Sequence, residues 1–280
     1  LMNSPVGRFA SLCCVLILVL GNAAARATQE QLLSFTDLHF DPFAEPALVP
    51  ELAQRPAGDW ATFLDQHAAR ELPDAGQDAN YFLFDSFLND ASARLARPRF
   101  ILFSGDLLAH HFNERFREQF PGAGEQALED FIVATVAFIV DKVNAEFPRV
   151  PVLFTLGNND AVAGDYAIVD GGAFLQRTAA PLFDSWLWPV AERERFFATY
   201  RQHGYYSMTL PYQSGTKLIS LNAVVFSRHY PWDDADAIAS EQLDWLEAEL
   251  AAAAADGLEV WLLLHIPPSV DVYATLRAGE

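Results

Sequence analysis

The chain is poor in cysteine: only two occur among its 280 residues, side by side as Cys13 and Cys14. Both lie in an apolar run at residues 9–20, which follows one arginine and precedes the small residues 23–27. This order predicts a secretory signal peptide over residues 1–27. The mature chain, residues 28–280, would then contain no disulfide, no thiolate metal ligand and no cysteine nucleophile.

Long apolar runs are also missing after residue 20. The run at 9–20 is too short to cross a bilayer comfortably, so we expect no stable membrane span after signal cleavage. An uncleaved N-terminal anchor is the alternative. The predicted location is secreted or periplasmic, and a cysteine-free exported protein suits the bacterial periplasm or exterior.

Basic residues are scarce, with 18 lysines and arginines against 37 aspartates and glutamates and a formal net charge of −19. This balance disfavours nonspecific binding to nucleic acid or to anionic lipid surfaces. Bound cations would still attract a phosphate group locally. The sequence contains neither a Rossmann glycine fingerprint nor a P-loop, so neither phosphate-binding loop is expected.

Alternating apolar patterns predict a single α/β domain over residues 28–280. Four apolar runs predict buried strands, at residues 32–36, 100–104, 152–156 and 260–264. A hairpin of residues 205–210 and 217–221 would make the sheet mixed. Helical spacing predicts four longer helices, at residues 81–95, 125–147, 191–202 and from Ser240 to just before Gly257. Residues 41–79 are rich in proline, alanine and acidic groups and predict an insertion above the strand ends.

Polar residues follow each of the four predicted strands. Asp37 and His39 follow the first strand, Asp106 the second, Asn158 the third and His265 the last. Ligands of open α/β sheets bind at this edge, and residues two apart on an extended strand share a face. Carboxylate, imidazole and amide groups brought together there can hold two divalent metals that activate water for attack on phosphorus.

These motifs resemble the calcineurin-like metallophosphoesterases, whose pattern is Asp-x-His, Gly-Asp, Gly-Asn-His-Asp/Glu, His and Gly-His-x-His. Five segments look more narrowly like the acid sphingomyelinase and endopolyphosphatase-like branch: Thr36-Asp37-Leu38-His39, Ser104-Gly105-Asp106 with His110 four residues later, Ser220-Leu221-Asn222, Gln242-Leu243-Asp244-Trp245-Leu246 and His265-Ile266-Pro267-Pro268. The resemblance implies a four-layer α/β/β/α sandwich with two mixed sheets. It also implies a phosphodiester, phosphoanhydride or phosphomonoester hydrolase.

By the same resemblance, Asp37 and His39 would bind a first metal, Asn158 and His265 a second, and Asp106 would bridge both. A bridging hydroxide would be the nucleophile. The metals would be two divalent ions, zinc first, with manganese or iron as alternatives. The expected partner is a phosphorylated small molecule, a lipid headgroup or polyphosphate, and no specific nucleic acid.

The resemblance also implies catalytic and substrate-binding residues. His110, four residues after Asp106, would stabilise or protonate the leaving group, and Asn159 would donate a hydrogen bond to a phosphoryl oxygen. His111 is adjacent and is assigned to substrate binding. Asn222 and the loop after it, with His229, Tyr230 and Trp232, are further candidates for substrate contact.

Several simpler interpretations stay open. Asp37 or Asp106 alone could cap a helix, His265 could be a core histidine, and Asn158 could satisfy a turn. No Gly-His-x-His follows His265, and we expect that this sequence is truncated before that motif. Asn159 stands where the family pattern has histidine, and this favours an endopolyphosphatase-like hydrolase as one alternative. The other is a noncatalytic exported protein that binds phosphorylated ligands.

Overall fold

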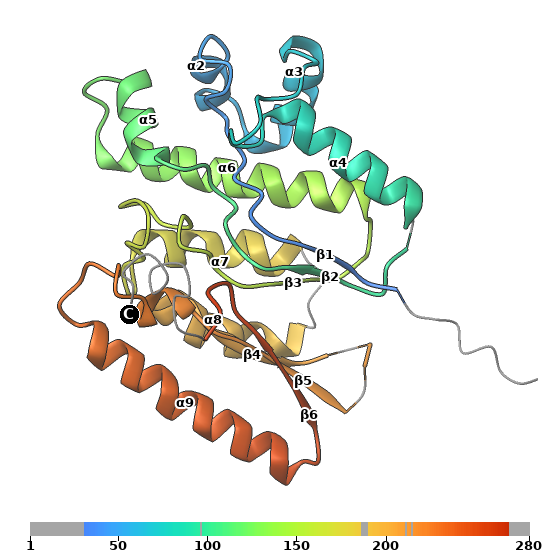
Figure 1. Cartoon of the computed structure of the whole chain (residues 1–280), viewed down its shortest axis with the longest axis vertical. Helices are drawn as coiled ribbons and strands as arrows, with labels where there is room; N and C mark the ends of the chain where they lie inside the picture. The colour runs from blue at the N-terminus through green and yellow to red at the C-terminus, as the bar shows by residue number, and fades with distance from the viewer. Residues whose placement is uncertain (1–30, 96, 186–189, 211, 214, 269–280) are drawn as a thin grey trace, which may run out of the picture. The chain divides into compact units, whose positions relative to one another are not determined.

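The computed structural model describes residues 31–95, 97–185, 190–210, 212–213 and 215–268 (Figure 1). The chain divides into two units, Leu1–Gln31 and Leu32–Glu280, and the fold below is that of the second. The predicted signal peptide falls on residues outside the described ones, so it stays a prediction. Within the described ranges, no helix is both long enough and apolar enough to cross a membrane.

The first sheet contains β1 (Leu33–Phe35), β2 (Ile101–Phe103) and β3 (Val152–Phe154), in that order. All three predicted strands are present, each shorter than expected. Both pairings are parallel, with Phe35 opposite Phe103 and Phe103 opposite Phe154. This sheet is therefore not mixed over its described strands, because each strand is followed by a helical crossover that returns the chain to the same end.

The crossovers carry the helices that cover this sheet. These are α2 (Val49–Ala53), η1 (Ala57–Asp59), α3 (Trp60–His67), α4 (Tyr81–Arg94), α5 (Phe112–Gln119) and α6 (Glu125–Glu146). Asn80 caps α4 by accepting a hydrogen bond from Leu83 N at 2.9 Å. Trp60 is fully buried, and its ring contacts those of Phe131 and Phe138 on α6. The predicted insertion is thus a packed helical layer, anchored by aromatic burial.

The second sheet contains β4 (Tyr206–Thr209), β5 (Thr216–Ser220) and β6 (Glu259–Leu263). Strands β4 and β5 are antiparallel, as the predicted hairpin requires, whereas β5 and β6 are parallel. The mixed character is therefore confirmed in this sheet. Figure 1 shows α9 (Ala235–Ala255) along it, and α9 contacts both β5 and β6.

Helix α9 begins five residues before Ser240, so the prediction that Ser240 caps this helix is wrong. Asp234 occupies the N-cap position, and its carbonyl accepts hydrogen bonds from the N–H groups of Ala237 and Ile238. Ser240 lies inside the helix because the acidic and alanine residues before it form its first turn. Gly257, at φ +66°, follows the end of the helix in the left-handed conformation expected of a glycine there.

The two sheets meet at β3. Helices α7 (Ala173–Ser185) and α8 (Arg193–His203), joined through η2 (Val190–Glu192), lie between β3 and β4 in the chain. Ser220 Oγ donates to Phe154 O at 3.0 Å, and Phe154 N donates to the hydroxyl of Tyr206 at 3.1 Å. Side chains of the second sheet thus satisfy backbone groups of β3. The α/β class with two sheets is confirmed, and the four-layer order stays a prediction.

Candidate metal centre

The polar segments that follow β1, β2, β3 and β6 lie at one edge of the structure. Main-chain pairing continues past β1, because Asp37 N donates to Gly105 O at 3.0 Å and His39 N donates to Asp106 O at 3.0 Å. His265, after β6, has its Nδ1 2.8 Å from Ser104 O. Loops that are distant in sequence are therefore held together by backbone contacts.

The backbone of three candidate ligands is left-handed, with φ of 53° at Asp37, 44° at His39 and 58° at Asp106. The expectation that Asp37 and His39 share a face of an extended strand is wrong, since β1 ends at Phe35. Positive φ costs non-glycine residues on the order of 1 kcal/mol each and persists only where neighbouring contacts fix it. The shared pairing with the Gly105 loop supplies such contacts.

Two glycines allow the β2 and β3 loops to approach closely. A Cβ on Gly105, which has φ +101°, would lie 2.6 Å from Gly157 N. A Cβ on Gly157 would lie 2.0 Å from Asp106 Oδ1. Neither space admits a side chain, because backbone and the Asp106 carboxylate already fill it. The Gly-Asp and Gly-Asn-Asn-Asp motifs therefore fit each other through their glycines.

The Asp106 carboxylate lies between two imidazoles. Its Oδ2 is 3.4 Å from His39 Nε2 and 3.5 Å from His265 Nε2. Asp37 Oδ1 lies 3.7 Å from His39 Nε2 on the more exposed side. Ligand atoms of Asp37, Asp106 and His265 all lie within 4.8 Å of one another. A central carboxylate with imidazoles on both sides is an arrangement suited to bridging two cations.

The second nitrogen of each imidazole faces a backbone carbonyl. His39 Nδ1 lies 3.1 Å from Leu108 O, and His265 Nδ1 lies 2.8 Å from Ser104 O. A carbonyl only accepts, so Nδ1 of each ring donates to it, and this leaves Nε2 of each ring directed at Asp106. A carboxylate that faces two imidazole nitrogens needs a positive charge beside it, which either a proton on Nε2 or a bound cation supplies. The donor set therefore fits divalent metals, with the carbonyls fixing the tautomers.

The pKa values of Asp106 and His265 also indicate that this site needs a positive charge beside the carboxylate. Burial opposes the charge on His265, but the hydrogen bond and charge of Asp106 outweigh it and raise the pKa of His265 to about 9. Burial likewise acts to raise the pKa of Asp106, but His265 and Asn159 lower it overall. The carboxylate thus stays negative and holds a proton on its neighbour. A metal cation would supply that positive charge instead.

Asn158 presents its carbonyl oxygen to the cluster. Its Nδ2 donates to Asp165 Oδ1 at 2.6 Å, and its Oδ1 lies 3.1 Å from His265 Nε2. Asn159 turns the other way, since its backbone N donates to Asp106 Oδ1 at 2.8 Å and its Nδ2 donates to Oδ2 at 3.0 Å. Asn159 therefore positions Asp106 in this structure. The hydrogen bond from Asn159 to a phosphoryl oxygen stays a prediction.

Asp160 holds the loop after β2 to the loop after β3, a role that the sequence did not reveal. It is fully buried, and its two oxygens accept hydrogen bonds from four backbone N–H groups, those of Asp106, Leu107, Leu108 and Gly157. Burial, together with the nearby Asp106 charge, raises the pKa of Asp160 to about 7. The one sequence feature that pointed to Asp160 was its position as the last residue of the Gly-Asn-Asn-Asp motif.

His110 lies beside the cluster and is held by Asp78. Its ring stacks on His39 with centroids 4.0 Å apart, and its Nδ1 lies 2.7 Å from Asp78 Oδ1. Its backbone N also donates to Asp78 Oδ2 at 2.9 Å. Arg115 pairs with Asp41 at 2.9 Å and lies 4.0 Å from Asp78. Asp78 therefore fixes the ring so that His110 Nε2 is left for other partners.

The predicted substrate-binding residues are placed differently from one another. His111 is exposed at the start of α5 and pairs with Glu114 at 3.0 Å. Asn222 is buried, and its amide is occupied by His203 O at 3.0 Å and Val224 N at 3.3 Å. The structure thus does not bring Asn222 to the cluster, because it caps η3 (Ala223–Phe226) instead. His229 is exposed, with its ring 5.1 Å from that of Tyr166.

Residues 31–277 match the family model of the calcineurin-like phosphoesterases. The match covers both sheets and every candidate ligand described above. The chain therefore belongs to the calcineurin-like phosphoesterase family. This confirms the resemblance that the strand-end motifs indicate.

Curated relatives include both branches that the motifs indicate. The endopolyphosphatase of Schizosaccharomyces pombe is 29% identical over 61% of this chain and 28% of its own length. Acid sphingomyelinase-like phosphodiesterase 3b of Mus musculus is 26% identical over 83% of this chain and 47% of its own. Sphingomyelinase phosphodiesterase C of Dictyostelium discoideum is 24% identical over 68% and 39%. The chain thus spans about a quarter to a half of these relatives.

Proposed function

We propose that the protein is an exported two-metal phosphoesterase that hydrolyses a phosphodiester, phosphoanhydride or phosphomonoester. The observation that carries this proposal is Asp106 Oδ2, which lies within 3.5 Å of the Nε2 atoms of both His39 and His265. When bound, two divalent cations lower the pKa of a shared water and neutralise charge on the phosphoryl oxygens. Zinc is our first choice, with manganese or iron as alternatives, because all three accept histidine and carboxylate ligands.

The chain itself supplies the remaining roles. Asp37, His39 and Asp106 would hold one cation, and Asp106, Asn158 and His265 the other. The stacked ring of His110 lies against His39, so its free Nε2 is near enough to protonate a leaving alkoxide. Asp78 faces Nδ1 of His110 at 2.7 Å and so fixes the orientation of the ring.

The relatives' names support two substrate classes. Polyphosphate is suggested by the endopolyphosphatase, and a lipid headgroup by the sphingomyelin phosphodiesterases. Asparagine at position 159, where the family pattern has histidine, favours polyphosphate. The larger share of the chain that the sphingomyelinase-like relatives match favours a lipid headgroup. Release of phosphate from polyphosphate and of headgroup from sphingomyelin vesicles, measured side by side, separates them.

Metal analysis together with hydrolysis of bis(4-nitrophenyl) phosphate tests the proposal. We expect about two equivalents of divalent metal in the full-length protein, with activity lost on chelation and restored by zinc, manganese or iron. A protein that binds the metals but releases no nitrophenol would instead be a noncatalytic phospho-ligand binder. Absence of both metal and hydrolysis would sink the phosphoesterase proposal.

His110→Gln is expected to slow esters with poor leaving groups by about a hundredfold while changing 4-nitrophenyl esters little, because only a basic alkoxide needs an acid. Asp78→Asn should act in the same direction by about tenfold and shift the alkaline limb of the pH profile, where a general acid loses its proton, since it removes the partner of His110. The measurement is kcat against leaving-group pKa.

His67→Gln, at the end of α3, is the matched control and should leave both ester classes unchanged. Equal loss on good and poor leaving groups in His110→Gln would contradict an acid role. An Asp78→Asn variant that lowers activity without any change in the pH profile would make Asp78 merely structural.

A further inference from the structure

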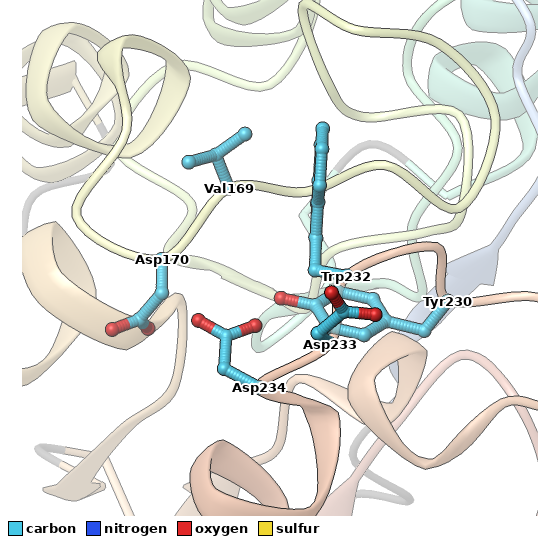
Figure 2. A pocket seen from close by; sticks show the side chains of 6 residues that line it. All are labelled: Val169, Asp170, Tyr230, Trp232, Asp233 and Asp234. Atoms are coloured by element: carbon cyan, nitrogen blue, oxygen red, sulfur yellow. The ribbon is translucent and has the colours of Figure 1, made fainter.

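A cavity of about 400 Å³ lies between the loop that precedes α7 and the loop that precedes α9 (Figure 2). Its lining consists of Val169, Asp170, Tyr230, Trp232, Asp233 and Asp234. None of the candidate metal ligands is among them. The volume falls within the range of about 300–1,000 Å³ that is usual for small-molecule sites.

The lining contains three carboxylates and no base. Asp170 is partnered, with its oxygens 2.9 Å from His203 Nδ1 and 3.0 Å from Gln202 Nε2. Asp233 and Asp234 have no side-chain partner among the described residues, and Asp234 makes no capping bond although it occupies the N-cap position of α9. The cavity therefore has uncompensated negative charge, which excludes an anionic occupant.

The three carboxylates do not converge closely enough for a metal ion. In the described part of the chain, only two groups of metal-ligand type have their atoms within 4.8 Å of one another, and neither includes Asp170, Asp233 or Asp234. A small hard cation needs oxygen ligands at about 2–2.6 Å. The described lining therefore offers no close cage of three carboxylates for such an ion.

Two aromatic side chains complete the cavity. Tyr230 is only 8% exposed, yet its hydroxyl lines the cavity and has no hydrogen-bond partner among the described residues. Burial and the charges of Asp234 and Asp170 raise the pKa of Tyr230 to about 12, so the hydroxyl stays protonated. Trp232 is 40% exposed, and Figure 2 shows its indole edge-on at one side of the cavity, across from Val169 and above Tyr230 and Asp233. Indole and phenol faces attract organic cations.

We propose that this cavity binds an organic ammonium cation, either free or as the charged end of a phosphate ester. Carboxylates supply the charge complement, Trp232 supplies the aromatic face, and Tyr230 supplies a hydroxyl that is open to the cavity. The cavity loop also contacts the loop of a candidate metal ligand. Asn158 O accepts a hydrogen bond from Tyr166 N at 2.8 Å, and the Tyr166 ring contacts His229, next to Tyr230.

Titration of the full-length protein with tetramethylammonium chloride, followed by broadening of the ligand methyl resonance, tests this site. We expect saturable binding in the presence of chelator, insensitive to equimolar sodium chloride and absent for the neutral analogue tert-butanol. Asp233→Asn with Asp234→Asn should weaken binding at least tenfold. Trp232→Ala should weaken it about fivefold or more, and Trp232→Phe much less, because phenylalanine keeps an aromatic face.

Asp236→Asn is the control, because it removes one carboxylate charge from the first turn of α9 outside the cavity. Loss of binding in this variant equal to that of the Asp233/Asp234 pair would show a general acidic surface and overturn the proposal. Equal binding of sodium or tert-butanol would do the same. Trp232→Ala keeps the test valid should the double variant fail to fold, since Trp232 is partly exposed.

Measuring KM with a charged and an uncharged ester identifies whether the cation is free or part of the substrate. An aryl phosphodiester that carries a trimethylammonium group should show a raised KM in Trp232→Ala, relative to its uncharged counterpart, if the ester brings the cation. Unchanged KM for both esters, with tetramethylammonium binding lost, indicates a free cation. Because the binding arm requires no metal, its failure is distinct from a failure of the phosphoesterase proposal.

Discussion

Asp106→Asn is expected to lower phosphodiester hydrolysis on the order of a thousandfold and to abolish tight binding of at least one metal. The carboxylate lies between His39 and His265, so removing its charge removes the group that both cations would share. Lewis-acid stabilisation is worth several kcal/mol, and each 1.4 kcal/mol is about tenfold in rate. Metal content per chain and kcat/KM of the full-length protein are the two measurements.

Asp256→Asn, at the exposed C-terminal end of α9, is the matched control and should change neither quantity. Thermal unfolding of both variants separates loss of metal from loss of fold, because Asn159 donates to both Asp106 oxygens and an amide cannot accept at both. Wild-type metal content and turnover in Asp106→Asn would end the two-metal interpretation.

The strand ends and the polar residues that follow them were predictable because their signal is local. Apolar runs that end in Asp37, Asp106, Asn158 and His265 identify strands, and parallel strands bring such ends to one edge. The backbone at Asp37 and His39 was not predictable in this way. Its left-handed conformation depends on pairing with the Gly105 loop, which is a contact between segments distant in sequence.

The role of Asp78 was not predictable from the sequence. It lies at the end of a stretch without helical or strand periodicity, and its importance rests on two contacts with His110, 32 residues further on. Nothing in the local pattern separates it from the other acidic residues of residues 41–79. Asp160 is different, since its position within Gly-Asn-Asn-Asp made it conspicuous while its four backbone partners were visible only in the fold.

Asn222 shows that a motif position alone does not reveal which contacts a side chain makes in the fold. Its backbone N and O pair with the side chain of Gln242 at 2.8 and 3.0 Å, joining η3 to α9. A buried amide whose oxygen and nitrogen are both hydrogen-bonded stabilises the loop that it caps. The neighbouring Tyr230 and Trp232 line a cavity, so the same loop does offer side chains for binding.

The clamp that holds β5 to α9 is expected to be the most sensitive point of the second sheet. Glu249 on α9 accepts from Lys217 Nζ, Arg195 Nη2 and Ser207 Oγ, each at 2.6 Å from its Oε2. The side chains of Glu249 and Lys217 are only 14% and 5% exposed. Two strands and two helices therefore depend on one carboxylate, and β6, which leads to His265, pairs with the strand that it anchors.

Glu249→Gln is expected to lower the free energy of unfolding by about 3 kcal/mol, because it leaves the Lys217 ammonium buried without a counter-charge. Glu247→Gln, an exposed glutamate on the same helix, is the matched control and should change it by less than about 0.5 kcal/mol. Chemical denaturation gives both values. A further Lys217→Met change should recover part of the loss in Glu249→Gln, since it removes the unpaired charge.

The effect of Glu249 should also depend on pH with a defined sign. Burial acts to raise the pKa of Glu249, but hydrogen bonds from Lys217, Ser207 and Arg195 lower it below its usual 4.5. A lowered folded-state pKa contributes stability that is fully present above the unfolded-state value and is lost as pH falls through the folded-state value. The stability difference between wild type and Glu249→Gln should therefore be constant near neutral pH and shrink below about pH 4.5. A difference that stays unchanged down to pH 3 would show that packing, and not the charge of Glu249, stabilises this clamp.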